Sequence, residues 1–358
     1  MNLLIVNLCQ ELVLKFIQNL SESPLSFLKS YYYSLLFISV VPKISDLGET
    51  GWVKIIQKYL SPPEVLSLDD DAVDYQLPLK YTIVNVDTWV ESTDRPISMD
   101  LKSCGYKAVA NAVSDVLAKG AFPRHVLTSV NLPGFTPVED ATQIVEGISE
   151  ACNELNLSYR GGDVNQQSSD ISITVTCIGQ SDGTPIPRHS DLKIGDEVWW
   201  VGTPLGSTGA IFHLLLATGE YERFREKINR YFFRPKLVLE FPEFVKRNRG
   251  NIVSSMDCSD GLAKTLYSLL NGTNVSIKLL PQILKVEPWI RKVSNDLVMD
   301  FVLFGGEELS IVFITRDIPI EEMRKIGGIK IGEVKESTLK LSLNGINIEN
   351  RGWQHFKQ

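Results

Sequence analysis

The sequence has few of the residues that build disulfide frameworks and zinc sites. Its five cysteines are scattered along 358 residues with no CxxC pair, and its four histidines form no HExxH or comparable ligand pair. This usage argues against both kinds of site. It is typical of reduced, mostly buried thiols, so we expect a cytoplasmic protein.

Excess positive charge and a long apolar run are also missing. The net charge of −7 leaves no surplus of cations to neutralise the phosphates of a nucleic acid. The apolar run at residues 31–41 is shorter than the roughly 20 residues of a membrane-spanning helix. The cationic start and small-residue cleavage site of a signal peptide are absent as well. We therefore expect neither a nucleic acid nor a membrane as a partner.

The length and the apolar pattern together predict two domains, because 358 residues exceed one typical hydrophobic core. Residues 1–44 differ in composition from the rest and form an extension that could precede the true start. Trp52, Ile56 and Tyr59 have the spacing of one helix face. Strand-like and helix-like segments then alternate, which favours α/β structure. We expect an N-terminal α/β domain at residues 45–190 and a C-terminal α/β domain at residues 191–358.

Acidic residues recur where strands are expected to end. Gly161 and Gly162 predict a turn before Asp163, and Ser259 is the expected N-cap of a helix. Strand ends can converge on one cleft, and carboxylates gathered there need a cation to stay ionised. Oxygen-only ligands suit Mg²⁺, which bridges carboxylates to the phosphates of a ligand such as ATP. The acids that predict this site are Asp69, Asp70, Asp71, Asp87, Asp115, Asp163, Asp257, Asp260 and Glu307.

Seven short motifs occur in an order that resembles the thiamine-monophosphate kinase family. They are LGETGW, DDDAV, NVDTWVE, GYKAVANAVSD, GGDVN, MDCSDGL and GGEEL, and RGWQHF follows near the end. The resemblance implies the two-domain α/β fold of aminoimidazole ribonucleotide synthetase, in which the N-terminal domain forms a homodimer through its sheet. It also implies direct, in-line transfer of a phosphoryl group from ATP to thiamine monophosphate with several Mg²⁺ ions.

The resemblance further implies roles for individual residues. Asp71, Asp257 and Asp260 would carry catalysis. The implied Mg²⁺ ligands are Asp71, Asn85, Val86 through its backbone oxygen, Asp87, Asp115, Asp163, Asp257 and Asp260. The implied ATP contacts are Gly162, Asp163, Arg188 and Ser259, and those to the thiamine moiety are Asp94, Glu307 and Trp353.

Asp69 replaces a glycine of the family pattern, GGDVN differs from it after Asp163, and several other departures lie on the substrate side. Asp94 stands where the family has histidine, and Leu309 and Ser310 stand where it has tyrosine and glutamate. Two alternatives therefore stay open. One is an ATP-dependent synthetase of the same superfamily with another acceptor, and the other is a non-catalytic nucleotide-binding paralogue. The clustered acids argue against the paralogue, because they destabilise a protein that binds no cation.

Overall fold

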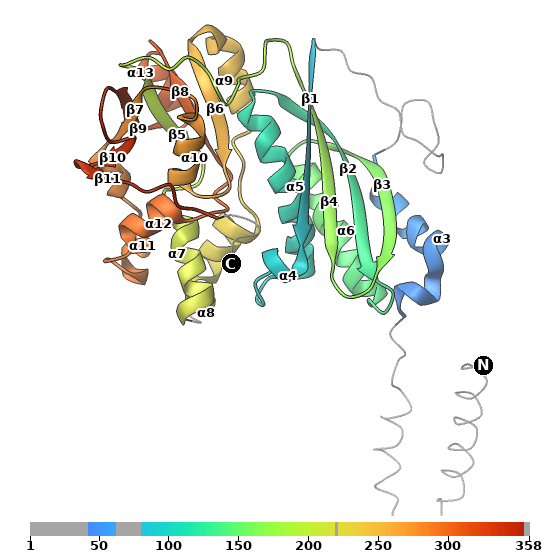
Figure 1. Ribbon diagram of the computed structural model, residues 1–358. Coiled ribbons are helices and arrows are strands. Elements are labelled where there is room, and N and C mark those ends of the chain that lie inside the picture. Colours follow the sequence, from blue (N-terminus) through green and yellow to red (C-terminus); the bar gives the residue numbers. More distant parts are fainter. Residues whose placement is uncertain (1–41, 62–79, 219–220, 354–358) are drawn as a thin grey trace, which may run out of the picture. The chain divides into compact units, whose positions relative to one another are not determined.

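Two β-sheets and their covering helices make up the described part of the chain. The computed structural model describes residues 42–61, 80–218 and 221–353, and the described residues from Ile44 onward belong to one compact unit (Figure 1). The expected extension 1–44 lies almost entirely outside the described residues. No helix in the described ranges is both long and apolar enough to cross a membrane.

The first sheet has four strands and two helices on one face. Its order is β1-β4-β2-β3, antiparallel except for the parallel pair β2 and β3. Helix α5 packs on β1, β4 and β2, and α6 packs on α5 and β3. The elements are α3 (Ile44–Ile56), η1 (Gln57–Tyr59), β1 (Tyr81–Val90), α4 (Glu91–Asp94), α5 (Leu101–Ala118), β2 (Phe122–Pro133), α6 (Val138–Glu154), β3 (Ser158–Gln167) and β4 (Ser172–Ser181).

The second sheet has seven strands in the order β11-β10-β7-β9-β5-β8-β6. Its strands are β5 (Glu197–Val201), β6 (Ile252–Cys258), β7 (Ser276–Leu279), β8 (Ser310–Thr315), β9 (Ile329–Lys335), β10 (Leu341–Leu343) and β11 (Ile346–Asn347). Its helices are α7 (Ser207–His213), η2 (Leu214–Thr218), α8 (Tyr221–Ile228), η3 (Asn229–Phe233), α9 (Phe241–Asn248), η4 (Arg249–Asn251), α10 (Leu262–Leu269), η5 (Pro281–Leu284), α11 (Pro288–Val293), α12 (Val298–Phe304) and α13 (Ile320–Lys325).

The central strands of the second sheet are buried on both faces. Successive side chains of a strand point to opposite faces. Trp199 and Phe313 accordingly join the hydrophobic core that includes α5 and α9, whereas Trp200 and Val312 join a second core with α10 and α12. Helix α5 therefore lies between the two sheets and packs against β6 and β8 as well as against the first sheet (Figure 1).

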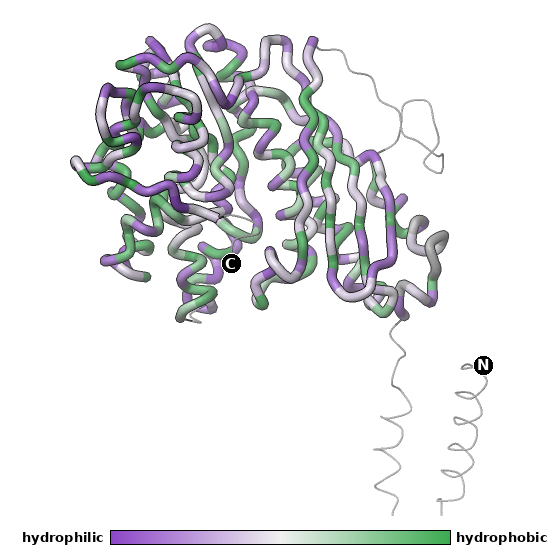
Figure 2. The backbone as a smooth tube through the Cα atoms, viewed as in Figure 1, coloured by the Kyte–Doolittle hydropathy of each residue, from purple (hydrophilic) through white to green (hydrophobic). Residues whose placement is uncertain are grey.

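The outer face of the first sheet is different. The side chains of β1 alternate between half-buried and exposed, and Val84 and Val86 on the outer face are 57% and 58% exposed. Figure 2 shows hydrophobic residues along the strands of this sheet. An antiparallel strand pair with one covered face normally presents polar side chains on the other. Exposed valines at this face are therefore candidates for contact with a partner.

Helices α5 and α6 approach each other at two glycines. A Cβ on Gly105 would lie 2.1 Å from the carbonyl oxygen of Ile144, and one on Gly147 would lie 1.8 Å from that of Lys102. Both distances are far inside van der Waals contact. Glycine is therefore required at both positions for the helices to pack this closely.

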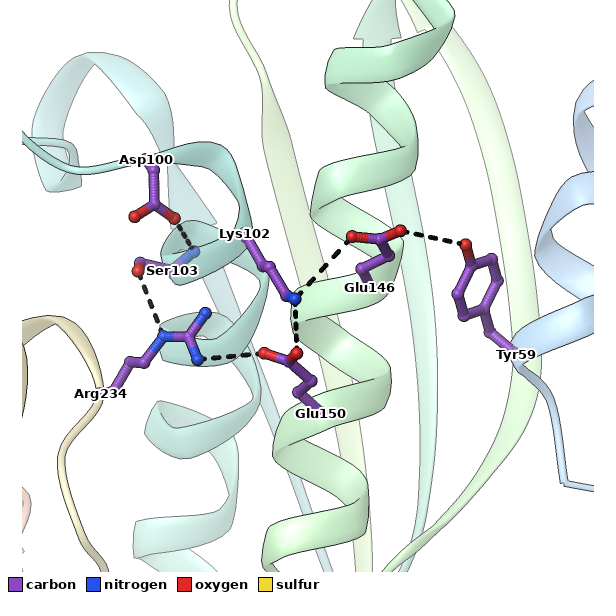
Figure 3. A network of polar contacts seen from close by, with 7 residues as sticks. All are labelled: Tyr59, Asp100, Lys102, Ser103, Glu146, Glu150 and Arg234. Atoms are coloured by element: carbon purple, nitrogen blue, oxygen red, sulfur yellow. Dashed lines mark hydrogen bonds and ion pairs between the residues drawn. The ribbon is translucent and has the colours of Figure 1, made fainter.

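Polar contacts fasten the same helix pair at its surface. Lys102 of α5 lies 2.5 Å from the carboxylate of Glu150 in α6, and Arg234 donates to the same carboxylate at 3.0 Å (Figure 3). Glu146 accepts a hydrogen bond from Tyr59 at 3.4 Å. Because these side chains are partly solvated, each pair contributes at most about 1 kcal/mol, less than the packing does.

The structure confirms the mixed α/β class and most of the expected elements, including the strand at Glu197–Val201. The turn expected at Gly161–Asp163 is wrong, because these residues continue strand β3 beside β2, with Gly161 and Gly162 at φ of 126° and 153° where the register shifts. The expected N-cap at Ser259 is also wrong. Helix α10 begins at Leu262, and Gly261 at φ 100° is its N-cap.

We expect Gly147→Ala to lower the free energy of unfolding by about 1–3 kcal/mol, because the new methyl group forces α5 and α6 apart. The better helix propensity of alanine offsets only roughly 0.5–1 kcal/mol. Urea unfolding at 25 °C measures the difference. The control is Gly250→Ala, where an added Cβ meets no described atom within 4 Å, chain neighbours aside. Equal stability of the two variants would contradict this account of the packing.

Candidate functional site

Side chains from β1, α5 and β6 converge between the two sheets. Asn85 of β1 donates from Nδ2 to Oδ2 of Asp115 in α5 at 2.8 Å. Ser114, the preceding residue of α5, donates from Oγ to Oδ2 of Asp257 in β6 at 2.9 Å. Three segments that are far apart in the chain thus meet at a pair of aspartates.

The Asp257 carboxylate is unfavourable to ionise, because it is buried and lies close to Asp115. Asp257 is 4% exposed. Burial raises its pKa well above the usual value, and the nearby charge of Asp115 raises it further. Burial also raises the pKa of Asp87, with smaller contributions from Asp115 and Glu307. A bound cation would remove this penalty, because it favours the ionised form of each carboxylate.

The donor set fits a hard divalent cation in its chemistry. Asp87, Asp115 and Asp257 offer carboxylate oxygens, which Mg²⁺ prefers. Asn111, one helical turn before Asp115, has a buried Oδ1 that accepts no hydrogen bond from the described residues. Among those residues, no three His, Cys, Asp or Glu side chains are close enough to form a complete metal site. Asp69, Asp70 and Asp71 lie outside the described residues.

Two cations lie at the edge of this acidic cluster. Lys119, just past the end of α5, donates from Nζ to the carbonyl oxygen of Ser255 in β6 at 2.8 Å. Burial lowers its pKa and the charge of exposed Arg188 lowers it further, while Asp257 acts in the opposite direction. Arg188, expected at ATP, therefore lies within electrostatic range of the cluster. Lys119 was not among the residues expected from the sequence.

The structure also gives the surroundings of Gly162, Asp163, Asp260 and Val86, which were expected in the metal and nucleotide sets. Asp163 and Gly162 are exposed on β3, which β2 and β4 separate from β1, and Asp163 accepts a hydrogen bond from Asn165 at 2.6 Å. Asp260 forms an ion pair with Lys264 at 2.7 Å. Val86 points its side chain to the outer face of the first sheet, and the atom expected to bind the cation is its backbone oxygen, between Asn85 and Asp87. In the structure, Asp163 and Asp260 thus have partners other than Asp115 and Asp257.

Three motifs of the second half of the chain meet through backbone hydrogen bonds. The amide of Glu307 donates to the carbonyl of Ser259 at 2.6 Å, and the amide of Leu309 donates to that of Cys258 at 3.0 Å. The amide of Trp353 donates to the carbonyl of Asp260 at 3.1 Å. The loop after β6, the loop before β8 and the C-terminal segment are therefore joined at one place.

A pocket of about 1010 Å³ opens beside this junction. Asp94, Glu307 and Trp353, the three residues expected at the thiamine moiety, all line it, and so does Ser259. Its remaining lining is largely apolar, and its two arginines, Arg95 and Arg351, are each paired with a carboxylate, of Glu91 and Asp300. The aromatic members are Phe212, Tyr221, Phe232, Phe301 and Phe304. A large apolar pocket with a few acids is suited to a flat, cationic organic ligand.

The backbone of the loop before β8 is strained where it reaches the pocket. Glu307 and Leu309 have φ of 64° and 48°, in the left-handed region that side-chain-bearing residues rarely adopt. Such conformations cost about 1–3 kcal/mol each and concentrate at functional sites. Glu307, whose side chain is 34% exposed, is therefore a candidate functional residue.

Beneath the pocket wall lies a buried carboxyl group. Glu308 is 1% exposed, and the thiol of Cys258 donates to its Oε2 at 3.6 Å. Burial raises the pKa of Glu308 to about 8. At neutral pH the folded protein therefore holds this carboxyl mostly protonated.

Comparison with known proteins places the chain among related sequences and structures. A family model described as "AIR synthase related protein, N-terminal domain" matches residues 69–181. The chain is 31% identical over 277 residues to the thiamine-monophosphate kinase of Methanopyrus kandleri, covering 76% of this chain and 84% of that protein. It is 27% identical over 321 residues to that of Aquifex aeolicus, covering 88% and 100%.

Among solved structures, "AaThiL complexed with AMPPCP and TMP" matches with a TM-score of 0.66 at 27% identity. The match covers 89% of this chain and 100% of that one. These findings confirm the expected fold, because the structural match covers most of the chain and the family model matches residues 69–181 within it.

We expect Glu308→Gln to flatten the pH dependence of thermal stability between pH 5 and pH 8. The folded-state pKa of about 8 lies above the ordinary glutamate value of 4.5, so the folded state binds more protons than the unfolded state in this window. Stability of the parent therefore falls as the pH rises through it, and glutamine removes this loss. Melting temperatures at intervals of 0.5 pH unit measure the effect.

The matched control is the exposed Glu321, changed to glutamine in the same way. Its profile should follow that of the parent. Parallel profiles for the parent and Glu308→Gln would show that the Glu308 carboxyl does not titrate in this range.

Proposed function

The chain belongs to the thiamine-monophosphate kinase family, and from this premise we propose that it phosphorylates thiamine monophosphate to thiamine diphosphate with ATP. A phosphate oxygen of the acceptor forms a bond to the γ-phosphorus of ATP, and the bond from that phosphorus to the β,γ-bridging oxygen breaks. The attacking oxygen is already anionic, so no general base is required. The pocket beside the acidic cluster is the observation that carries this proposal.

The acceptor and the pocket have matching chemistry. Thiamine monophosphate has a cationic aromatic ring, which is attracted to aromatic faces and to carboxylates. We propose that Trp353, 55% exposed at the pocket, stacks on this ring. Asp94 and Glu307 would face its positive charge. The carboxylate of Asp94 is oriented by a hydrogen bond from the amide of Val90 at 2.7 Å.

We propose that the acidic cluster acts through Mg²⁺. When bound, Mg²⁺ offsets the negative charge of the phosphate oxygens in a loose transition state. Ser114 and Asn85 orient the carboxylates of Asp257 and Asp115 by the hydrogen bonds described above. The proposed ligands are Asp71, Asn85, Val86, Asp87, Asp115, Asp163, Asp257 and Asp260, of which Asp71, Asp257 and Asp260 act in catalysis. Gly162, Asp163, Arg188 and Ser259 would bind ATP.

We also propose that two copies associate through the outer face of the first sheet, with residues 45–190 forming the dimerising domain and 191–358 the second. Exposed Val84 and Val86 support a second copy as the occupant of this face. Cys104, Cys152, Cys177 and Cys258 are buried free thiols, which is consistent with a reducing compartment such as the cytoplasm.

The first test compares the acceptors directly. Purified protein with ATP and Mg²⁺ is incubated with thiamine monophosphate, free thiamine or an aminoimidazole ribonucleotide precursor, and the products are separated by chromatography. We expect thiamine diphosphate from thiamine monophosphate only. Nucleotide binding without this product would show that the pocket binds an acceptor other than thiamine monophosphate.

In the same assay, we expect Asp257→Asn to lower kcat by about a hundredfold or more, because it removes one charge from the cation site. Folding should be retained, since asparagine fills the same space. The control is Asp182→Asn, a partly exposed aspartate paired with Lys246 at 3.3 Å. Near-normal turnover by Asp257→Asn would refute its role.

The dimer is tested by Val84→Lys, which places a charge on the outer face of the first sheet. We expect the variant to sediment as a monomer of about half the parent mass, because burying an unpaired lysine is costly. Ile346→Lys in β11, which is 61% exposed, is the matched control. A monomeric parent, or a variant that stays dimeric, would rule out this face.

A further inference from the structure

Lys107 is a buried cation that contacts two lining residues of the acceptor pocket without lining the pocket itself. It lies in α5, and its side chain is 3% exposed. Its Nζ is 3.0 Å from Oε2 of Glu307 and 4.8 Å from the ring centroid of Phe232, and both of these residues line the pocket. The residue occurs in the GYKAVANAVSD motif, where the sequence assigned a role only to Asp115.

Lys107 holds Glu307 at two points. Besides the carboxylate, Nζ reaches the backbone carbonyl oxygen of Glu307 at 3.5 Å. One contact sets the direction of the side chain, and the other sets the orientation of the peptide group. Since Glu307 has a strained backbone with φ of 64°, its conformation needs support from its surroundings.

We propose that Lys107 is a positioning residue that fixes Glu307 for recognition of the acceptor, an inference that rests on the proposed function. The Glu307 carboxylate is 34% exposed at the pocket, whereas Lys107 is almost entirely covered. Lys107 therefore acts on the acceptor through Glu307 and does not touch it. Loss of the cation leaves a partly buried carboxylate without its partner, which favours another position of the loop.

The position of Lys107 also joins the two sheets across the pocket. Helix α5 packs on the first sheet, and Glu307 lies in the loop that leads into β8 of the second. The contact spans 200 positions of the sequence. It is thus one of the contacts that fix the position of the acceptor pocket relative to Asp115, which lies two turns further along α5.

The test compares Lys107→Met with Lys102→Met. Both lysines lie in α5, but Lys102 pairs with Glu150 outside the pocket (Figure 3). For Lys107→Met we expect the KM for thiamine monophosphate to rise about tenfold, the loss expected for one misplaced charged contact. The KM for ATP and kcat should change little. Lys102→Met should match the parent, and Lys107→Arg should recover part of the loss.

A second measurement does not depend on turnover. The amides of Glu307 and Leu309 are hydrogen-bonded to the loop after β6, so their hydrogen exchange reports on the position of this segment. We expect peptides covering residues 305–309 to exchange faster in Lys107→Met and unchanged in Lys102→Met. If Lys107→Met does not fold, Lys107→Arg is measured, with an intermediate result expected.

The outcomes separate the two proposals. An inactive parent refutes the proposed function, and the exchange measurement still decides whether Lys107 positions the loop. Unchanged exchange and an unchanged KM for thiamine monophosphate in a folded Lys107→Met would overturn the inference. A fall in kcat with an unchanged KM for both substrates would also overturn it, since this would indicate a general structural role.

Discussion

The close packing of helix α5 between two sheets is the constraint on which the rest of the structure depends. Fifteen of its 18 residues are buried. Because Gly105 has no side chain, the carbonyl oxygen of Ile144 in α6 lies where a Cβ would otherwise be. A helix covered on nearly all sides must be built from small residues, as the run of alanine and valine shows. Any polar residue in such a helix must find a partner in another element.

The polar residues of α5 meet this requirement at the site. Lys107, Asn111 and Asp115 are spaced four residues apart and share one face of the helix. Lys107 pairs with Glu307, and Asp115 accepts from Asn85 and lies close to Asp257. The helix thereby places one cation beside the pocket and one anion in the acidic cluster. One face of α5, with Lys107 buried and Asn111 and Asp115 half-buried, thus supplies groups to both halves of the proposed reaction.

Much of the fold could be predicted from local patterns, and the failures have physical reasons. The helix face at Trp52 and Ile56 and the strand at Glu197–Val201 follow from side-chain periodicity alone. Gly161 and Gly162 suggest a turn by composition, but pairing with β2 keeps them in a strand, where a Cβ on Gly162 would lie 1.6 Å from the Thr128 carbonyl. Ser259 has the chemistry of an N-cap, yet its carbonyl is taken up by Glu307 and the helix starts later.

The sequence by itself determined which chemistry is available: the order of its motifs identified the family, and its aspartates predicted a site for hard cations. Only the tertiary structure decided which of these groups meet. It joined Asp115 to Asp257 and left Asp260 paired with Lys264, and it revealed Lys107 and Lys119 as cations of the site. The reason is that a residue type is local, whereas the partner of a buried charge is set by the packing of segments up to 200 positions apart.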